Sequence, residues 1–479
     1  MKIYRKYSRY CFLGILTASI FLGSCGKNFL DAPPILNLPE DVSMDTKARI
    51  EAQTVGLYAS LKNGNFYAGR YQIYNDIRGD EFINRTNNVV TGFGVYMFTN
   101  DPSDTYVANF WIQGYLTINR INKFLHDIEL VKEGIITDVE KSEFISEAKF
   151  IRALTYYALI QLFAKPYTLD NGASKGIPLR LNPETTIANN SHPSSPVKDI
   201  YAQILKDLED AEKFISAPRA GDYAFTRAHK NTVIALKTRV FLAMANYQQV
   251  LVEGKKLVSA TAPFQAPSGI THALAPNIVD VFKNYKTAEN IFSFPYAANN
   301  APGTQNQLGF YYNAGNIEYY LNTGSTGIFS NPNWPSEDSR KSQLTTLYPN
   351  STWNLLTKWG IAPFLDWVPV IRYAEVLLNV AEAEAEVGDE KRAIALLEAI
   401  RHRSNPGYEF KDLSDKQKII DAILLERRIE LLGEGFRAPD LQRRLQPLPA
   451  VGTGRTVPFS DNRYTFPIPT DEVLINPQG

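Results

Sequence analysis

Apolar residues recur every three to four positions along most of the chain, which is the pattern of helices that bury one face. Ser414 and Thr226 are expected to open two of these helices, and Gly388 and Gly433 are expected in the left-handed conformation that ends a helix. The chain is therefore predicted to be mainly α-helical. The predicted helices span residues 45–61, 106–132, 137–164, 196–215, 226–258, 369–387, 390–403 and 414–433.

Two stretches resemble tetratricopeptide units, which are helix–turn–helix repeats with small residues where the helices cross. The first spans 226–258 and contains Ala235 and Gly254, and the second spans 369–403 and contains Ala381 and Ala393. Small side chains at these positions let two helices approach closely. Because the match is degenerate, ordinary amphipathic hairpins are the alternative.

Residues 260–366 differ in character from the predicted helices. This stretch is rich in Gly, Asn, Ser, Thr, Pro and aromatic residues and lacks a sustained helical period. We expect irregular structure with short strands, for example over 290–294. Long loop-rich inserts in compact proteins are commonly functional. The predicted body, 41–479, is a single composite unit with helical-repeat regions at about 41–260 and 367–445 around the insert 260–366.

The first 24 residues have the features of an export signal. Lys2 and Arg5 begin a basic segment, and the apolar run 12–22 is shorter than the roughly 20 residues that a membrane-spanning helix needs. The following Leu-Gly-Ser-Cys25 resembles the lipobox of bacterial lipoproteins, in which the cysteine receives acyl chains of the palmitate type. Several such chains anchor a protein stably. Residues 25–40 are then an extended lipidated leader, and an ordinary secreted protein with a chance cysteine is the alternative.

The chain carries no net charge, because 50 basic residues balance 50 acidic ones. It therefore lacks the field that would attract nucleic acid or an anionic membrane surface, and a neutral, polar partner suits it better. The two cysteines, Cys11 and Cys25, are assigned to the removed signal and to lipidation, so no disulfide is expected. Aromatic residues make up 12% of the chain, which fits either a core or a ligand site.

Sequence signatures of catalysis are missing. The chain has no nucleophile elbow, phosphate-binding loop or zinc helix, and its five histidines are scattered, so neither a metal nor a cofactor is expected. Glu382 and Glu386 lie one turn apart on a predicted helix and could in principle serve a glycosidase. A solvated helix face is the preferred interpretation, and the protein is predicted not to be an enzyme.

Several segments, in order along the chain, resemble the SusD/RagB family of outer-membrane nutrient-uptake lipoproteins. The similarity spans essentially the whole mature chain. The segments are CGKNFLD (25–31) with Pro33, EAKFIRALTYYALIQLF (147–163) with GIPL (176–179), RYAEVLLNVAEA (372–383), IRHR (400–403), ERRIEL (426–431), EGFR (434–437) with DL (440–441), and FPIP (466–469) with NP (476–477).

The resemblance implies tetratricopeptide-like helical hairpins packed against a loop-rich subdomain. It also implies a lipid-anchored protein on the extracellular face of the outer membrane, which captures oligosaccharides for a partner SusC-like, TonB-dependent transporter. A peptide-binding protein of the RagB kind is the alternative within the family. A lipid-anchored glycoside hydrolase and a repeat scaffold that binds only protein are the alternatives outside it.

A sugar site needs a flat apolar surface for the C–H face of a pyranose, flanked by planar hydrogen-bonding groups. Loops that carry both types occur in 74–101 and in 306–334, and we expect them to converge on one exposed pocket. Trp111 resembles the family's structural tryptophan and is expected in the core. Residues 96–100 lack the tryptophan of the starch-binding members, which is a departure from their aromatic arc. The candidate ligand-binding residues are Asp76, Asp80, Arg85, Phe98, Asn100, Tyr311, Tyr312, Tyr319, Tyr320 and Trp334.

Overall fold

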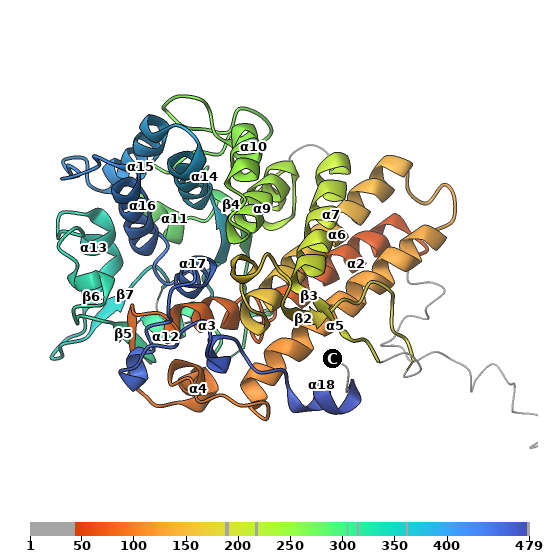
Figure 1. Ribbon diagram of the computed structural model, residues 1–479. Helices are drawn as coiled ribbons and strands as arrows, with labels where there is room; N and C mark the ends of the chain where they lie inside the picture. The colour runs from red at the N-terminus through yellow and green to blue at the C-terminus, as the bar shows by residue number, and fades with distance from the viewer. Residues whose placement is uncertain are drawn as a thin grey trace, which may run out of the picture.

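The computed structural model describes residues 44–476 except 187–190, 216–218, 304, 314–315 and 361–362. The predicted signal, Cys25, the leader and Pro477 lie outside the described residues. The described part is mainly helical, with short strands, as the sequence predicted (Figure 1). Among the helices it describes, none combines the length and the apolar character needed to cross a membrane.

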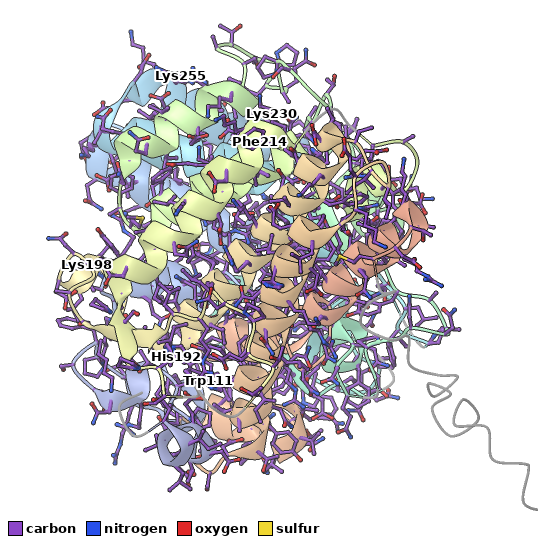
Figure 2. The ribbon with its side chains drawn as sticks, turned by 90° about the vertical axis from the view of Figure 1, so that its right-hand side faces the viewer. Trp111, His192, Lys198, Phe214, Lys230 and Lys255 are labelled. Atoms are coloured by element: carbon purple, nitrogen blue, oxygen red, sulfur yellow. The ribbon has the colours of Figure 1, made fainter. Side chains whose placement is uncertain are left out.

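Four long helices form one side of the molecule, and α6 is the most deeply buried of them (Figures 1 and 2). Thr137 and Glu140 form a capping box at the start of α6, which satisfies backbone N–H groups at that end. Close packing of α5 on α6 needs a small residue at Gly114, where a Cβ would lie 2.8 Å from the Leu159 side chain. The four helices are α2 (Lys47–Leu61), α5 (Thr105–Asp127), α6 (Asp138–Phe163) and α7 (Val197–Phe214).

The other side contains the two predicted hairpins. The range predicted as one helix, 226–258, consists of α9 and α10, because Ala245 adopts a left-handed conformation (φ 53°) and Asn246 caps α10. Gly254 of α10 packs against α14, where a Cβ would lie 2.5 Å from Val380 Cγ2. The small residue thus sets the helix crossing, as expected. The helices are α9 (Lys230–Ala243), α10 (Tyr247–Leu257), α14 (Tyr373–Val387), α15 (Glu390–Ser404) and α16 (Lys416–Glu430).

Helix ends agree with the sequence in part. Gly433 is left-handed (φ 80°), as predicted, but Gly388 is not (φ −118°). The reason is that the Glu384 side chain folds back and accepts a hydrogen bond from the Asp389 N–H at 2.9 Å, which ends α14 without a left-handed residue.

Two predicted helix starts are also wrong. Asp415, rather than Ser414, caps α16. His229, rather than Thr226, caps α9, because Thr226 ends the separate short helix α8 (Tyr223–Thr226).

Strand pairs attach the insert to the rest of the chain. The predicted strand 290–294 is β4 (Asn290–Phe294), which pairs antiparallel with β8 (Val368–Arg372), the segment before α14 that was predicted as helix. Strand β1 (Phe82–Asn84) pairs with β5 (Tyr319–Leu321), and β6 (Thr345–Leu347) pairs with β7 (Asn354–Leu356). A fourth pair, β2 (Lys175–Pro178) and β3 (Ser194–Pro196), lies beside α7.

Short helices complete the fold, and one hydrophobic core cluster extends from Ile50 to Phe466. The insert therefore shares its core with the helical regions. The short helices are α3 (Arg70–Ile77), α4 (Phe93–Tyr96), α11 (Ile278–Lys283), α12 (Leu308–Tyr312), α13 (Ser339–Leu344), α17 (Arg437–Arg443) and α18 (Thr470–Ile475).

A buried ion network joins the insert to β8, α15 and α16. Arg372 pairs with Glu289, Glu430 and Glu434, so one guanidinium connects three segments. Burial alone would raise the pKa of Glu430, but the cations beside it, Arg403 first, hold that pKa well below its usual value. Five cations and five carboxylates take part: Arg340, Lys358, Arg372, Arg401 and Arg403 with Glu289, Asp338, Glu426, Glu430 and Glu434.

His229 and His272 form a buried stacked pair, with ring centroids 5.5 Å apart and planes 17° apart. Within the described part of the chain, neither Nε2 atom has a hydrogen-bond partner. Burial, and then the neighbouring ring, lowers the pKa of His229 to about 3. Burial lowers the pKa of His272 to about 4.

We expect this pair to make the fold acid-sensitive. The unfolded chain takes up protons as the pH falls through about 6.5, whereas the folded chain keeps both rings neutral. Stability from the pair is therefore complete above pH 6.5 and declines below it, by about 2 kcal/mol per histidine at pH 5. Urea unfolding at pH 7 and pH 5 measures the loss, which should be smaller in a variant that carries His229→Gln and His272→Gln.

The control is His126→Gln, since the side chain of His126 is 57% exposed. This variant should lose as much stability on acidification as the unsubstituted protein. Equal losses in the double variant and the unsubstituted protein would contradict the assignment.

Candidate functional site

The loops proposed to carry the site do meet in space. Pairing of β1 with β5 places Ile83 opposite Tyr320, and the Arg85 N–H donates to the Glu318 carbonyl at 2.9 Å. The 74–101 loops and the insert thus converge, although more than 200 residues separate them in the chain. Most of the candidate side chains where these loops meet are buried, so they do not line an open pocket.

Three of the predicted ligand-binding tyrosines, Tyr311, Tyr312 and Tyr319, are fully buried. Their hydroxyl groups are used internally: Tyr312 donates to Asp76 (3.2 Å), and Tyr319 donates to the Thr91 carbonyl (3.1 Å). A buried aromatic ring with a satisfied hydroxyl is a core residue and offers no face to a ligand.

Four further candidates are buried as well. Asp76 accepts a second hydrogen bond, from Gly435 N–H (2.9 Å), and burial raises the pKa of its carboxyl group well above the usual value. Asp80 pairs with Arg437 (2.7 Å). Trp334 and Phe98 lie in hydrophobic clusters. The expectation of an exposed pocket is therefore wrong for Asp76, Asp80, Phe98, Tyr311, Tyr312, Tyr319 and Trp334.

Arg85, Asn100 and Tyr320 remain at the surface. Asn100 lies in the loop before α5. Tyr320 stacks on Trp353 with ring centroids 5.8 Å apart and an interplanar angle of 27°. Trp353 in turn stacks on Tyr348, at 6.1 Å and 19°. All three rings are partly exposed. We call Tyr320, Tyr348, Trp353 and Arg85 the aromatic platform.

Tyr348 and Trp353 were not predicted as site residues from the sequence. They flank the tip of the β6–β7 hairpin, where the Tyr348 N–H donates to the Trp353 carbonyl at 2.9 Å. The intervening Asn350 is left-handed (φ 58°), as the tip of a tight connection requires. The sequence pattern that could have identified them is a pair of aromatic residues on either side of a Pro-Asn-Ser turn, which is typical of a β-hairpin.

Arg85 is held in a fixed orientation beside these rings. Its Nε and one terminal nitrogen donate to the carbonyls of Ile317 and Asn316, both at 2.6 Å. Its guanidinium carbon lies 5.5 Å from the Trp353 ring centroid. The platform thus combines aromatic surface with a planar donor that is ordered before any ligand arrives, which is what a pyranose ring and its hydroxyl groups need.

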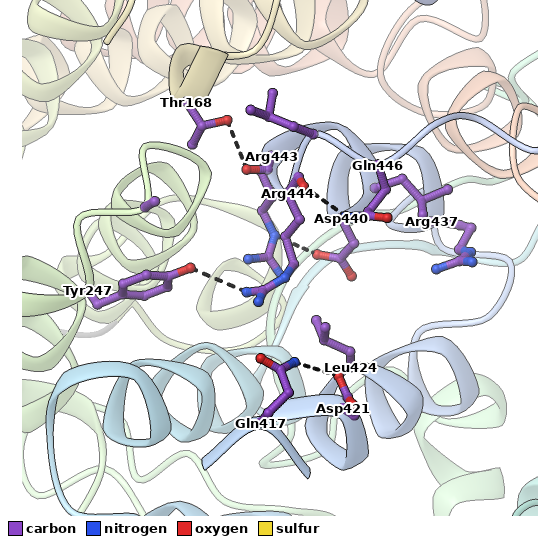
Figure 3. A pocket seen from close by; sticks show the side chains of 13 residues that line it. Thr168, Tyr247, Gln417, Asp421, Leu424, Arg437, Asp440, Arg443, Arg444 and Gln446 are labelled. Carbon is purple, nitrogen blue, oxygen red and sulfur yellow. Dashed lines mark hydrogen bonds and ion pairs between the residues drawn. The ribbon is translucent and has the colours of Figure 1, made fainter. Parts of the chain in front are cut away.

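Two hollows lie elsewhere on the molecule. A pocket of about 610 Å³ lies between the start of α10, α16 and α17 (Figure 3). A second, of about 360 Å³, lies beside α5 and contains Tyr115, Leu116 and Arg180. Trp111, labelled in Figure 2, borders the second hollow but is only 3% exposed, as expected of a core residue. Its indole N–H donates to Glu472 at 3.3 Å.

Glu382 of α14 is not solvated, contrary to the preferred interpretation of the sequence, whereas Glu386 is partly exposed. Glu382 is fully buried and binds Arg443 and Arg444. Burial alone would raise its pKa, but Arg443 holds that pKa below the usual value. A general acid needs a raised pKa, so Glu382 is a structural anion. Glu426 and Glu430 of α16 are likewise buried and pair with Arg340. In the described ranges, no group of three or more His, Cys, Asp or Glu side chains could hold a metal.

Two family models match the chain, one described as "SusD family" over residues 272–478 and one as "Starch-binding associating with outer membrane" over residues 28–242. The chain is similar to a SusD superfamily protein of Bacteroides fragilis of known structure, with 34% identity, a TM-score of 0.82, and coverage of 91% of this chain and 99% of that one. A SusD-like protein of Formosa agariphila is 23% identical over 100% of this chain and 99% of its own length. A structure named "Laminarin binding SusD-like protein" has 21% identity and a TM-score of 0.71, and covers 90% of this chain and 98% of its own.

Burial makes a direct prediction for the aromatic residues. Tyr311→Ala and Trp334→Ala should each lower the free energy of unfolding by about 3 to 5 kcal/mol, because each leaves a cavity in the core. Tyr320→Ala and Trp353→Ala should cost about 1 kcal/mol or less, since their rings are partly exposed. Urea denaturation checks all four, with Trp111→Ala as the buried reference. Equal losses across the set would show that the platform is core as well.

Proposed function

The chain belongs to the SusD/RagB family, and on that premise we propose that it is a cell-surface, lipid-anchored protein that binds oligosaccharides. The observation that carries the proposal is the aromatic platform, in which three partly exposed rings stack in sequence beside a fixed guanidinium. Aromatic faces bind the C–H face of a sugar, and a planar donor binds its hydroxyl groups. The balanced net charge supports a neutral ligand.

Capture alone does not bring a sugar into the cell. We therefore assign the bound oligosaccharide to import through a partner TonB-dependent transporter of the SusC type, beside which Cys25 would anchor the protein. Support comes from the lipobox-like residues before Cys25 and from the family description "Starch-binding associating with outer membrane". The laminarin-binding relative supports a glycan over a peptide as the ligand class.

A peptide ligand and a hydrolase are the competing functions. Extended peptides are commonly held through main-chain hydrogen bonds at a sheet edge, whereas the platform consists of side chains, namely three partly exposed aromatic rings and a guanidinium. A glycosidase needs two carboxyl groups on opposite sides of the scissile bond. Glu318, which pairs with Arg85 through the backbone, is buried, and its carboxylate accepts hydrogen bonds from Thr91 and Thr86. The glycan-binding function therefore fits the platform better than either competitor.

The platform can be tested directly. A soluble form that lacks the signal and Cys25, residues 26–479, is screened on a glycan array, and the retained oligosaccharides are titrated by calorimetry. Trp353→Ala should weaken binding about tenfold, because a stacked aromatic contributes about 0.5 to 1.5 kcal/mol beyond its buried area. Tyr320→Ala and Arg85→Ala should weaken it in the same direction, with little change in thermal stability.

Trp367→Ala is the matched control, since Trp367 is also a partly exposed tryptophan stacked on a tyrosine, Tyr285, at 5.6 Å. It should leave the affinity unchanged. Retention of no glycan, or full affinity in Trp353→Ala and Tyr320→Ala together, would refute glycan binding by the platform. Shortened sugars appearing during incubation would instead identify a hydrolase.

The anchor and the transporter have their own test. Cys25→Ala should shift the protein from the outer-membrane fraction to the soluble fraction in cells that lack the transporter, because no acyl chain can then be attached. From cells that carry both proteins, gentle detergent extraction of the unsubstituted protein should recover a large β-barrel partner. Membrane retention of Cys25→Ala without the transporter would contradict lipidation at this residue.

A further inference from the structure

The pocket between α10, α16 and α17 has the size of a ligand site, and we call it the α17 pocket. Its volume of about 610 Å³ lies within the range of about 300 to 1,000 Å³ that small-molecule sites occupy. Tyr247 at the start of α10, Gln417 and Asp421 of α16, and Arg444 at the end of α17 line it (Figure 3). It does not include any residue of the aromatic platform, so it is a second surface.

The floor of the α17 pocket is rigid and electrically compensated. Arg443 and Arg444 both bind Glu382, at 2.7 Å and 2.9 Å, and Arg444 also lies 3.3 Å from Glu386. Asp440 accepts hydrogen bonds from Arg443 and from Arg427 of α16, both at 2.9 Å. Every guanidinium on the floor is matched by a carboxylate, which leaves little net charge to attract an anion. A neutral ligand fits this arrangement.

The walls mix apolar and planar polar groups. Leu424, Leu441 and the partly exposed ring of Tyr247 supply apolar contact. At the rim, Gln417 and Asp421 are exposed and joined by a hydrogen bond of 2.8 Å. Amide and carboxylate groups pair with the adjacent hydroxyl groups of a sugar, which both donate and accept. The combination suits a polyhydroxylated ring more than a purely apolar ligand.

Two residues of the wall have strained backbone. Ala245 and Leu445 are left-handed, with φ of 53° and 52°, although neither is glycine or asparagine. A side chain in this conformation costs about 1 to 2 kcal/mol. Such strain persists where the surroundings hold it and is concentrated at binding sites. Both residues turn the chain at the mouth of the pocket, Ala245 before α10 and Leu445 after α17.

We propose that the α17 pocket is a second carbohydrate site, which takes one or two neutral pyranose rings at the end of a chain. A pocket bounded by three helices and without a run of stacked rings suits a chain end, whereas the platform suits an internal stretch. Only the ligand class rests on the proposed function, because the pocket and its lining are independent of the platform.

The test uses Trp353→Ala of the same soluble form, so that the platform is impaired, with maltose, cellobiose and laminaribiose as probes in saturation-transfer NMR. At least one disaccharide should still bind. Asp421→Ala added to Tyr247→Ala should raise its dissociation constant at least fivefold, and glucuronic acid should bind no more tightly than glucose.

A blocking experiment avoids any effect of the substitutions on folding. Residues 26–479 contain no cysteine, so Gln417→Cys offers a single thiol at the mouth of the pocket. Coupling a bulky maleimide to it should abolish disaccharide binding in the Trp353→Ala background. Coupling the same group to Lys255→Cys, on the exposed side of α10 (Figure 2), should not.

Three results would overturn the proposal: no disaccharide binding in Trp353→Ala, full binding after the Gln417→Cys block, or tighter binding of glucuronic acid than of glucose. None of these results bears on glycan binding by the platform. That proposal is tested separately, by the loss of affinity for longer oligosaccharides in Trp353→Ala. The two proposals therefore fail separately.

Discussion

The buried network of five cations and five carboxylates is the constraint on which the rest of the structure depends. A charge taken out of water must be paired, and removing one partner of such a pair commonly costs about 3 to 5 kcal/mol. Here Arg340 and Lys358 of the insert bind carboxylates of α16 and the residues after it, and Arg372 joins them to Glu289 before β4. The insert can therefore take only one position against the helices. That position determines where the β1–β5 and β6–β7 pairs lie. It therefore also determines where the aromatic platform reaches the surface.

The segments that carry the family resemblance supply much of this ion network. The segments that resemble the family, 372–383, 400–403, 426–431 and 434–437, supply Arg372, Arg401, Glu426, Glu430 and Glu434 to the network. They specify how the insert docks, and none of the four platform residues belongs to them. Tyr348 and Trp353 come from a hairpin outside these segments. The resemblance therefore predicts the fold, whereas the residues that we propose to bind the ligand lie outside the segments that carry it.

The helices could be predicted from local sequence patterns, whereas the burial of residues in the insert depends on contacts between distant segments. Helical periodicity found the long helices, most clearly α5 and α7, which bury one face. It merged α9 and α10 because their turn uses Ala245, which gives no glycine or proline signal. In the insert, composition found the aromatic residues but not their burial. Whether Tyr312 is core depends on Asp76, 236 positions away, and Tyr319 depends on Thr91. Such distant partners cannot be read from the local sequence. Buried Tyr319 and partly exposed Tyr320, which are adjacent in β5, therefore look alike in the sequence, and the pairing of β5 with β1 distinguishes them.

A second charge cluster connects the two candidate binding surfaces. Arg437 of α17, which lines the α17 pocket, binds Asp80, and Arg428 of α16 binds Glu81, each at 2.7 Å. Asp80 and Glu81 directly precede β1, and β1 leads into Arg85 of the platform. These side chains are largely buried, so the contacts are not screened as surface ion pairs are. Pocket and platform thus share one rigid frame. Two modest sites held at a fixed separation bind a polymer that reaches both more tightly than either site alone, because the second contact forms at a high effective concentration.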